Sequence, residues 1–283
     1  MRDTSTDAFS RRDFWLCLAR AFAPPGGGEY LTAFAQDLPD DLSAIAEEIG
    51  LVLSAEITSL RKAAQQMTDP MELQRLYAAL FLTPPTPVMM NTGFYIDGGV
   101  MGVSEQGLQE AYARHGYARH AEFRDLNDTI GVQAEFLSVL YDKAGEKARA
   151  AEGMDARAYL AEADAFIATY PARWITPFLR DIEATCDRLA LNPVYAHLAR
   201  ILWLAVEGAI SAPTFHEMKG GMEMLPAGSS RGIGALTAED LAEIAWRLEQ
   251  DGLSWDHVAE NEGWDDATFF ARRAQGKADA LVH

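Results

Sequence analysis

The stretch Asp125-Leu-Asn-Asp-Thr-Ile-Gly-Val-Gln-Ala-Glu-Phe-Leu-Ser-Val-Leu-Tyr141 predicts the central helix of the protein. Apolar residues recur in it at spacings of three and four, namely Ile130, Ala134, Leu137 and Tyr141, and also Val132, Phe136 and Leu140. A helix that is apolar around most of its circumference is buried, so we expect this one in the core. Asn127 or Asp128 is suited to cap its first turn. Gln133 and Glu135 interrupt the apolar pattern, and such polar groups need partners or a water-filled groove.

Helical signals continue through the rest of the chain, and no alternating strand pattern of useful length occurs. Asp69-Pro70-Met71-Glu72 combines an N-cap, a proline at the first helical position and an acid in the first turn, and predicts a helix start. Ser104 is expected to cap a helix that runs to His115. The other predicted helices are a first one with Phe14, Leu18 and Phe22 facing inward, then residues 29–36, 41–66, 155–189 with interruptions near Pro171 and Pro177, and 192–210. The predicted fold class is all-α, a single helical bundle domain with a small C-terminal helical appendage.

Composition divides the chain into three predicted parts. Residues 1–212 carry the helical domain, residues 213–235 are a linker rich in Gly, Met and Pro, and residues 236–283 form an acidic three-helix appendage. The appendage resembles a helix-turn-helix in outline, but its 11 acidic residues outnumber its 4 basic residues. Because DNA phosphates require a basic footprint, a docking or dimerising element is the better interpretation.

The charge of the whole chain restricts its partners. Its 283 residues include 24 basic and 42 acidic ones, which gives a formal net charge of −18. This balance disfavours nucleic acid as a partner. An acidic surface attracts cationic partners such as basic peptides, but it also simply keeps a protein soluble, and composition leaves both interpretations open.

Several features indicate a cytoplasmic protein without stable membrane association. The two cysteines, Cys17 and Cys186, lie in apolar helical contexts, which is typical of core residues in a reducing compartment. The segment Ser10-Arg11-Arg12-Asp13-Phe14-Trp15-Leu16 resembles a twin-arginine export motif, but Arg20 and Pro24-Pro25 interrupt the apolar region that such a signal needs. We therefore expect this segment to belong to the first helix. No apolar run reaches the length of about 18 residues that a membrane span requires.

Residues that could carry chemistry do not cluster in the sequence. None of the six histidines is spaced from another His, a Cys or a carboxylate as in a zinc site. No nucleophile motif is visible, and the glycines of the irregular stretch 83–102 match no phosphate-binding loop. The sequence therefore predicts no catalytic activity, no metal site and no other cofactor.

Three segments follow one another in an order that is typical of one protein family. They are Tyr77-Ala-Ala-Leu80-Phe81, Phe94-Tyr95-Ile96-Asp97 and Asp128-Thr-Ile-Gly-Val-Gln-Ala-Glu-Phe-Leu137. They resemble the Tyr-x-x-Leu-Phe segment, the Ser-x-Tyr-x-Asp loop and the Asp-His-Ile-x-x-Glu-Leu-x-Phe-Met helix start of the TorD/DmsD family of redox-enzyme maturation chaperones. The opening residues 14–30, the segment Tyr170 to Trp174 and the segment Asn192 to Tyr195 also fit, so the resemblance covers roughly residues 11–212.

The chain departs from the family pattern at positions that matter for binding. The family's first His is Thr129 here, its first Glu is Gln133, and its second His is Tyr170. In the family these positions belong to the region implicated in binding signal peptides. The departures point to an atypical partner or an atypical way of holding it.

The resemblance implies a non-catalytic assembly chaperone in the cytoplasm. Such a protein binds the apo catalytic subunit of a molybdopterin-containing oxidoreductase, often through its twin-arginine leader peptide, until the cofactor is inserted. Arginine side chains need carboxylate acceptors, and the apolar part of a leader needs a groove. The expected peptide-binding or client-binding residues are Tyr77, Phe81, Tyr95, Asp97, Asp128, Thr129, Gln133, Glu135, Phe136, Tyr170 and Trp174. For several of them a structural role is the alternative, with Asp128 as an N-cap and Phe81, Phe136 and Trp174 as core residues.

Two other functions stay open from the sequence. One is a regulatory protein whose appendage binds nucleic acid, and the other is a nucleotide-binding enzyme that uses the loop at residues 91–102. The identity of the client, the choice between leader and mature domain, and the oligomeric state are also open. A homodimer that exchanges elements through the linker is one candidate.

Overall fold

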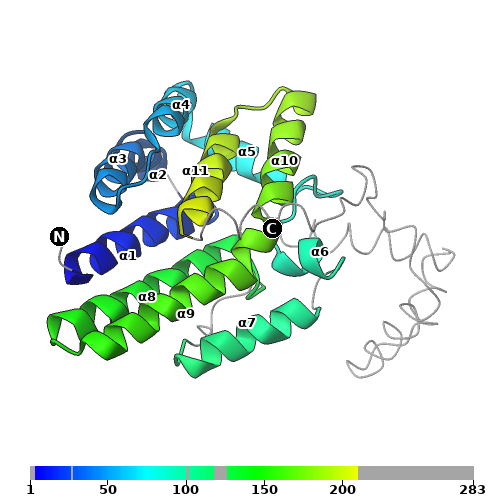
Figure 1. The fold of residues 1–283 in the computed structure, drawn as a ribbon. Coiled ribbons are helices and arrows are strands. Elements are labelled where there is room, and N and C mark those ends of the chain that lie inside the picture. The colour runs from blue at the N-terminus through cyan, green and yellow to red at the C-terminus, as the bar shows by residue number, and fades with distance from the viewer. Residues whose placement is uncertain (1–3, 27, 100–101, 118–125, 210–283) are drawn as a thin grey trace, which may run out of the picture. The chain divides into compact units, whose positions relative to one another are not determined.

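The structure is a computed structural model that describes residues 4–26, 28–99, 102–117 and 126–209 (Figure 1). About 78% of the described residues are helical, and no strand occurs among them. The predicted all-α class is therefore confirmed. The predicted boundary at residue 212, the linker at 213–235 and the appendage at 236–283 lie outside the described residues.

The helices occupy the following ranges in chain order. They are α1 (Thr4–Ala21), α2 (Gly28–Thr32), the π-helical segment η1 (Ala33–Asp37), α3 (Leu38–Ile49), α4 (Ser54–Gln65), α5 (Pro70–Phe81), α6 (Thr92–Ile96), α7 (Val103–Arg114), α8 (Ile130–Arg149), α9 (Gly153–Thr169), α10 (Pro171–Leu189) and α11 (Val194–Ala209).

Helix α8 is central, as its apolar pattern predicts. Helix α1 packs along one side of α8 and α9 along another, and the three lie side by side in Figure 1. Ile130, Phe136 and Leu137 of α8 are fully buried. Helix α1 turns Phe14 and Leu18 into the same core, as expected. The central layer therefore consists of the first helix and the helix predicted from residues 125–141.

Contacts between α1 and α8 show that the two helices run antiparallel. A Cβ atom added at Gly145 would meet the Phe9 ring at 2.6 Å, whereas one added at Gly131 would lie 3.7 Å from the Ala19 carbonyl oxygen. The end of α1 therefore lies beside the start of α8. This pairing brings residues that are more than a hundred positions apart in the sequence to one place.

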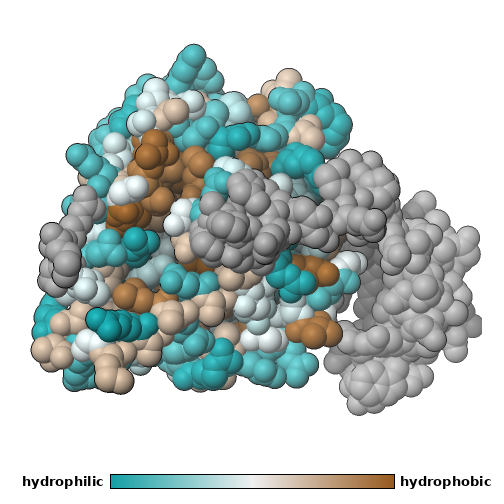
Figure 2. All heavy atoms as spheres, in the orientation of Figure 1, coloured by the Kyte–Doolittle hydropathy of each residue, from teal (hydrophilic) through white to brown (hydrophobic). Residues whose placement is uncertain are grey.

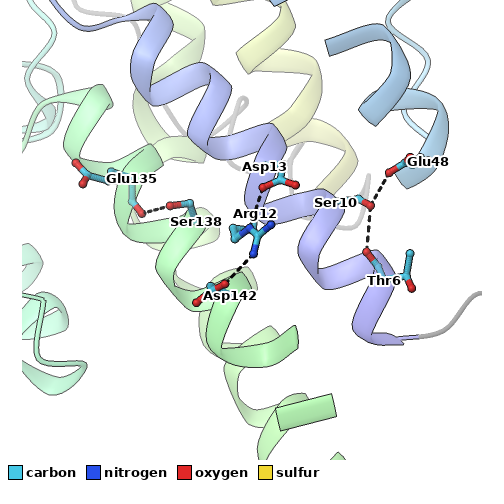
Figure 3. A network of polar contacts seen from close by, with 8 residues as sticks. All are labelled: Thr6, Ser10, Arg12, Asp13, Glu48, Glu135, Ser138 and Asp142. Atoms are coloured by element: carbon cyan, nitrogen blue, oxygen red, sulfur yellow. Dashed lines mark hydrogen bonds and ion pairs between the residues drawn. The ribbon is translucent and has the colours of Figure 1, made fainter. Parts of the chain in front are cut away.

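The segment that resembles an export motif lies within α1, in agreement with its interpretation as part of the first helix. Arg12 donates to Asp13 at 2.8 Å and to Asp142 of α8 at 3.0 Å (Figure 3). Ser10 donates to Glu48 of α3 at 2.7 Å. These residues therefore tie α1 to two neighbouring helices.

The predicted helix start at residues 69–72 is confirmed. Asp69 is the N-cap of α5, and its carboxylate accepts a hydrogen bond from the Met71 amide at 2.9 Å. Pro70 occupies the first helical position, where its missing N–H is not needed. Leu73, Tyr77 and Leu80 then bury the inner face of α5.

Two predicted helix boundaries near the N-terminus are wrong. The range 41–66 is two helices, because Gly50 ends α3 in the left-handed conformation with φ of 75°. The short helix predicted at 29–36 instead continues through η1 into α3, so that residues 28–49 are helical without a break. Helical periodicity alone did not distinguish one long helix from two that bury the same face.

Two further expectations need correction. Ser104 does not cap α7: the N-cap is Gly102, and the Asp97 carboxylate accepts the Ser104 amide at 2.9 Å. The interruption predicted near Pro171 is present, since α10 begins at that residue. The interruption predicted near Pro177 is absent, because Pro177 lies inside α10 and the helix continues past it. A proline removes one backbone hydrogen bond, and the buried face of α10 (Trp174, Ile175, Phe178) offsets that loss.

Apolar side chains are exposed on one face of the described domain. Figure 2 shows them gathered over the region between α3, α4 and α11. Ile49, Leu51 and Leu204 of these segments are only partly buried, and Val52 is 89% exposed. Within the described part of the chain, no helix is both long enough and apolar enough to cross a membrane.

Candidate functional site

A pocket of about 240 Å³ lies where the end of α1 meets the start of α8. Its wall consists of Leu16, Ala19, Arg20, Phe22, Ala23, Pro24, Tyr77, Met90, Thr129, Gly131, Val132 and Glu135. Pockets that enclose a drug-sized molecule span about 300–1,000 Å³. The volume and the largely apolar wall therefore suit one or two anchoring side chains of a partner rather than a large cofactor.

Hydrogen bonds to the last turn of α1 fix one wall of the pocket. The hydroxyl of Tyr30 donates to the Arg20 carbonyl at 2.8 Å, and that of Tyr77 donates to the Phe22 carbonyl at 3.4 Å. The last carbonyls of a helix have no partner within the helix, so side chains from α2 and α5 satisfy them here. Pro24 follows and prevents the helix from continuing.

Main-chain pairing fixes the opposite wall. The Ile130 amide donates to the Met90 carbonyl at 3.0 Å, and the Thr92 amide donates to the Asp128 carbonyl at 3.0 Å. Asn91 and Thr129 form the bridge between these two bonds. This short antiparallel contact places Met90 beside the first turn of α8, which is why both line the pocket.

Asp128 lies behind this wall and is fully buried. Its carboxylate accepts hydrogen bonds from the Asn91 side-chain amide at 2.7 Å and from the Gly93 amide at 3.0 Å. The predicted capping of α8 by Asn127 or Asp128 is therefore wrong, because the N-cap is Thr129 and it makes no side-chain capping bond. Both oxygens of Asp128 are occupied by the chain itself, so the residue supports the pocket wall and does not line it.

Gln133 completes this buried polar group. Its side-chain amide donates to the Asp128 carbonyl at 2.8 Å and to the Thr92 hydroxyl at 2.5 Å. Its side-chain oxygen has no hydrogen-bond partner among the described residues. Gly93 is required here, since a Cβ atom would meet the Gly99 carbonyl at 2.7 Å. Hydrogen bonds to Asp128 and Gln133 thus fix the start of the 91–102 loop, and they occupy the amides of Thr92 and Gly93.

Glu135 is exposed and stands at the edge of the pocket. In Figure 3 its carboxylate points away from the cluster around Arg12. Tyr117 lies beside it: burial raises the pKa of the Tyr117 phenol, and the charge of Glu135 with a hydrogen bond to it raises that pKa further. Glu135 is therefore a carboxylate that a partner can reach.

Asp97 lies outside the pocket and stabilises the start of α7. Its Oδ2 atom accepts from the Ser104 amide at 2.9 Å and from the Ser104 hydroxyl at 2.5 Å. A Cβ atom at Gly102 would come within 2.2 Å of the same oxygen, so the chain needs glycine there. Asp97 thus positions the loop between α6 and α7.

Tyr95 and Trp174 form a separate aromatic cluster. Their rings stack at a centroid distance of 5.4 Å, and Trp174 is fully buried. The Tyr95 hydroxyl donates to Asp181 of α10 at 3.2 Å. Burial raises the pKa of Tyr95 well above its ordinary value, followed by the effect of the Asp181 charge. The cluster fixes α6 against α10.

The other aromatic residues expected at the site are packed in or against the core. Phe81 packs on Tyr77 and Tyr195 at ring distances of 5.1 and 5.3 Å. Phe136 and Tyr170 both pack on Phe166, at 4.9 and 5.1 Å. For Phe81 and Phe136, the alternative interpretation as core residues agrees with these positions.

The structure therefore brings together only part of the expected site. Tyr77, Thr129 and Glu135 line the pocket, and Asp128 and Gln133 support it from behind. Sequence reasoning missed the contribution of α1, above all Arg20. One feature of the sequence could have indicated this contribution. The first helix is apolar up to its end before Pro24-Pro25, where the chain must turn, and such an end packs against another helix. Among the described residues no group of three or more His, Cys, Asp or Glu side chains could hold a metal ion.

The described residues thus form an all-helical domain with a small, largely apolar pocket that a buried polar network supports. The family described as nitrate reductase delta subunit matches residues 25–180 of the chain. Because this match spans more than half of the sequence, the protein belongs to the nitrate reductase delta subunit family, and its resemblance to the TorD type is confirmed.

Other comparisons add little to this assignment. No curated protein matches the chain. A crystal structure of a protein from Archaeoglobus fulgidus that is assigned to redox enzyme maturation is similar, with a TM-score of 0.42 and 20% sequence identity. That similarity covers 69% of this chain and 93% of the other.

Proposed function

We propose that the protein is a non-catalytic assembly chaperone that binds the apo catalytic subunit of a molybdopterin-containing oxidoreductase and holds it until the cofactor is inserted. The observation that carries this proposal is the family match over residues 25–180. The matched range includes Tyr77 and the start of α8, and therefore half of the residues in the pocket wall.

The geometry of the pocket supports peptide binding. A leader peptide presents basic residues followed by an apolar, helix-forming segment, and the pocket offers a reachable carboxylate, Glu135, beside an apolar wall. Guanidinium groups bind carboxylates through paired hydrogen bonds. We propose that the amino-terminal segment of the client docks here in the cytoplasm. Where that segment is a twin-arginine leader, one of its two arginines pairs with Glu135.

A second surface supports contact with a large partner. The exposed apolar residues between α3, α4 and α11 (Figure 2) are of the kind that marks protein–protein contacts in soluble proteins. A folding client subunit presents apolar surface of its own, so this face provides a second place of contact. The nucleotide-binding alternative is weaker, because the amides of Thr92 and Gly93 at the start of the 91–102 loop are already bonded to Asp128.

The test is affinity purification of the tagged chain from its native host, grown under anaerobic respiratory conditions, followed by mass spectrometry. We expect the catalytic subunit of a molybdenum oxidoreductase to co-purify. Glu135→Ala should reduce its recovery, whereas Glu110→Ala, on the exposed side of α7 and outside the pocket, should not. Preparations without any oxidoreductase subunit, repeated across growth conditions, would contradict the proposal.

A further inference from the structure

The pocket wall carries two opposite charges, one from each of the helices that form it. Arg20 is contributed by the last turn of α1 and Glu135 by the second turn of α8, and both residues are exposed. Neither forms an ion pair with the other or with another described residue. Both charges therefore lack an ionic partner among the described residues and can meet a partner that enters the apolar space between them, although Glu135 also accepts a hydrogen bond from the Tyr117 hydroxyl.

Among the residues that the structure describes, the pocket wall contains no second carboxylate that is available in the same way. Asp128 is buried with both oxygens bonded to residues 91 and 93, and Asp97 lies outside the pocket at the start of α7. Gln133 is neutral, and its amide donors are bonded within the chain. The pocket itself is thus neutral in sum, although the whole chain carries a charge of −18.

We infer that the pocket selects a client segment in which a large apolar side chain lies between one basic and one acidic residue, with Arg20 determining the acidic position. The apolar side chain fills the space lined by Phe22, Met90 and Val132. The basic residue pairs with Glu135 and the acidic residue with Arg20. A segment with two adjacent cations finds only one carboxylate and meets repulsion from Arg20. This inference rests on the proposed function and specifies the chemistry of its client.

The experiment uses the full chain and four labelled synthetic peptides, with binding measured by fluorescence anisotropy at low salt. All four share a central Phe-Leu pair, which is flanked by Arg and Glu, by two Arg, by two Glu, or by two Gln. The wild-type chain should bind the Arg/Glu peptide about threefold to fivefold more tightly than the others, as expected for partly exposed ion pairs. Raising the salt concentration should reduce this preference.

Charge reversals on the protein give the decisive comparison. Arg20→Glu should move the preference to the peptide with two Arg, and Glu135→Arg should move it to the peptide with two Glu. The double variant should prefer a peptide with the same centre in which Arg and Glu have exchanged places. Since both side chains are exposed, the variants should keep the thermal unfolding curve of the wild type.

The outcomes separate this inference from the proposed function. Equal binding of all four peptides, an order of affinities that the reversals do not change, or no peptide binding at all would overturn the inference. If an oxidoreductase subunit still co-purifies with the chain in those cases, the proposed function stands without it. If no such subunit co-purifies with the wild-type chain, the proposed function itself fails.

Discussion

Asp128 shows how a residue that resembles a binding-site acid serves the fold. It is fully buried, and two donors at the start of α6, the Asn91 side-chain amide and the Gly93 backbone amide, depend on it. Removing the acceptor leaves both donors buried without partners, and each such group costs about 1–3 kcal/mol. We expect Asp128→Ala to lower the free energy of unfolding by about 2–4 kcal/mol, measured by urea denaturation.

The matched control for this substitution is Asp155→Ala in the first turn of α9, where the side chain is 62% exposed. Its effect should stay below about 0.5 kcal/mol, as for most surface substitutions. Equal effects of the two substitutions would show that the Asp128 hydrogen bonds do not hold the loop.

The contribution of Asp181 to the stability of the fold should depend on pH in a way that can be measured. Burial raises the pKa of its carboxyl, and the Tyr95 hydrogen bond and the nearby Arg180 offset this in part. A raised folded-state pKa means that the stability contributed by Asp181 is fully present below the unfolded pKa and is lost as the pH rises through the folded value. Asp181→Asn keeps an acceptor for Tyr95 without a charge to bury.

The variant Asp181→Asn should therefore gain stability relative to wild type as the pH rises from below to well above the ordinary aspartate pKa of about 3.9. Denaturant unfolding at a series of pH values gives the difference in free energy directly. A difference that is constant across this range would mean that the pKa of Asp181 is the same in the folded and unfolded states.

At the scale of the helix, the break between α3 and α4 depends on one glycine. Gly50 ends α3 with φ of 75°, and a Cβ atom built there would meet nothing within 4 Å. The cost of Gly50→Ala is therefore conformational alone, and we expect a loss of about 1 kcal/mol in unfolding free energy.

Gly153→Ala is the control for this backbone effect. Gly153 begins α9, has no positive φ and also has open space around its Cβ position. Alanine is a better helix former than glycine, so this variant should be neutral or more stable by up to about 1 kcal/mol. If the two alanine variants changed stability alike, left-handed backbone geometry would not explain the end of α3.

The local sequence pattern was sufficient to predict which segments are helical, but not where several of these helices begin and end. The apolar periodicity of residues 130–141 and the start at Asp69-Pro70 were sufficient to predict α8 and α5, because the burial of α8 and the capping of α5 depend on nearby residues. The break at Gly50 and the capping of α7 by Asp97 depend on backbone geometry and on a loop that folds back. A single sequence shows neither of these.

The sequence predicted wall residues of the candidate site on α5 (Tyr77) and at the start of α8, but none on α1. Glu135 stood out as a polar residue in an apolar helix, and it is exposed at the pocket. Gln133 stood out for the same reason, yet it is buried and bonded within the chain. Arg20 could not be assigned, because its place beside α8 is set by the antiparallel packing of helices far apart in the sequence.

At the scale of the whole molecule, the charge of −18 should act on association. Long-range attraction raises the association rate of a cationic partner and is screened by salt. We expect the association rate of a peptide with net positive charge to fall by about tenfold or more between low and high salt, in stopped-flow measurements. A neutral peptide with the same apolar centre is the control, and a cationic peptide that is equally insensitive to salt would contradict this expectation.

The central claim, that the protein acts on the maturation of a molybdenum enzyme, is tested most directly by the cofactor content of the client. The measurement compares the molybdopterin bound per catalytic subunit in a host that lacks this chain with that in the same host after the gene is restored. We expect that, without this chain, the catalytic subunit is synthesised but carries several-fold less cofactor, and that complementation restores full loading. Complete cofactor loading of every molybdenum oxidoreductase in the absence of the chain would contradict it.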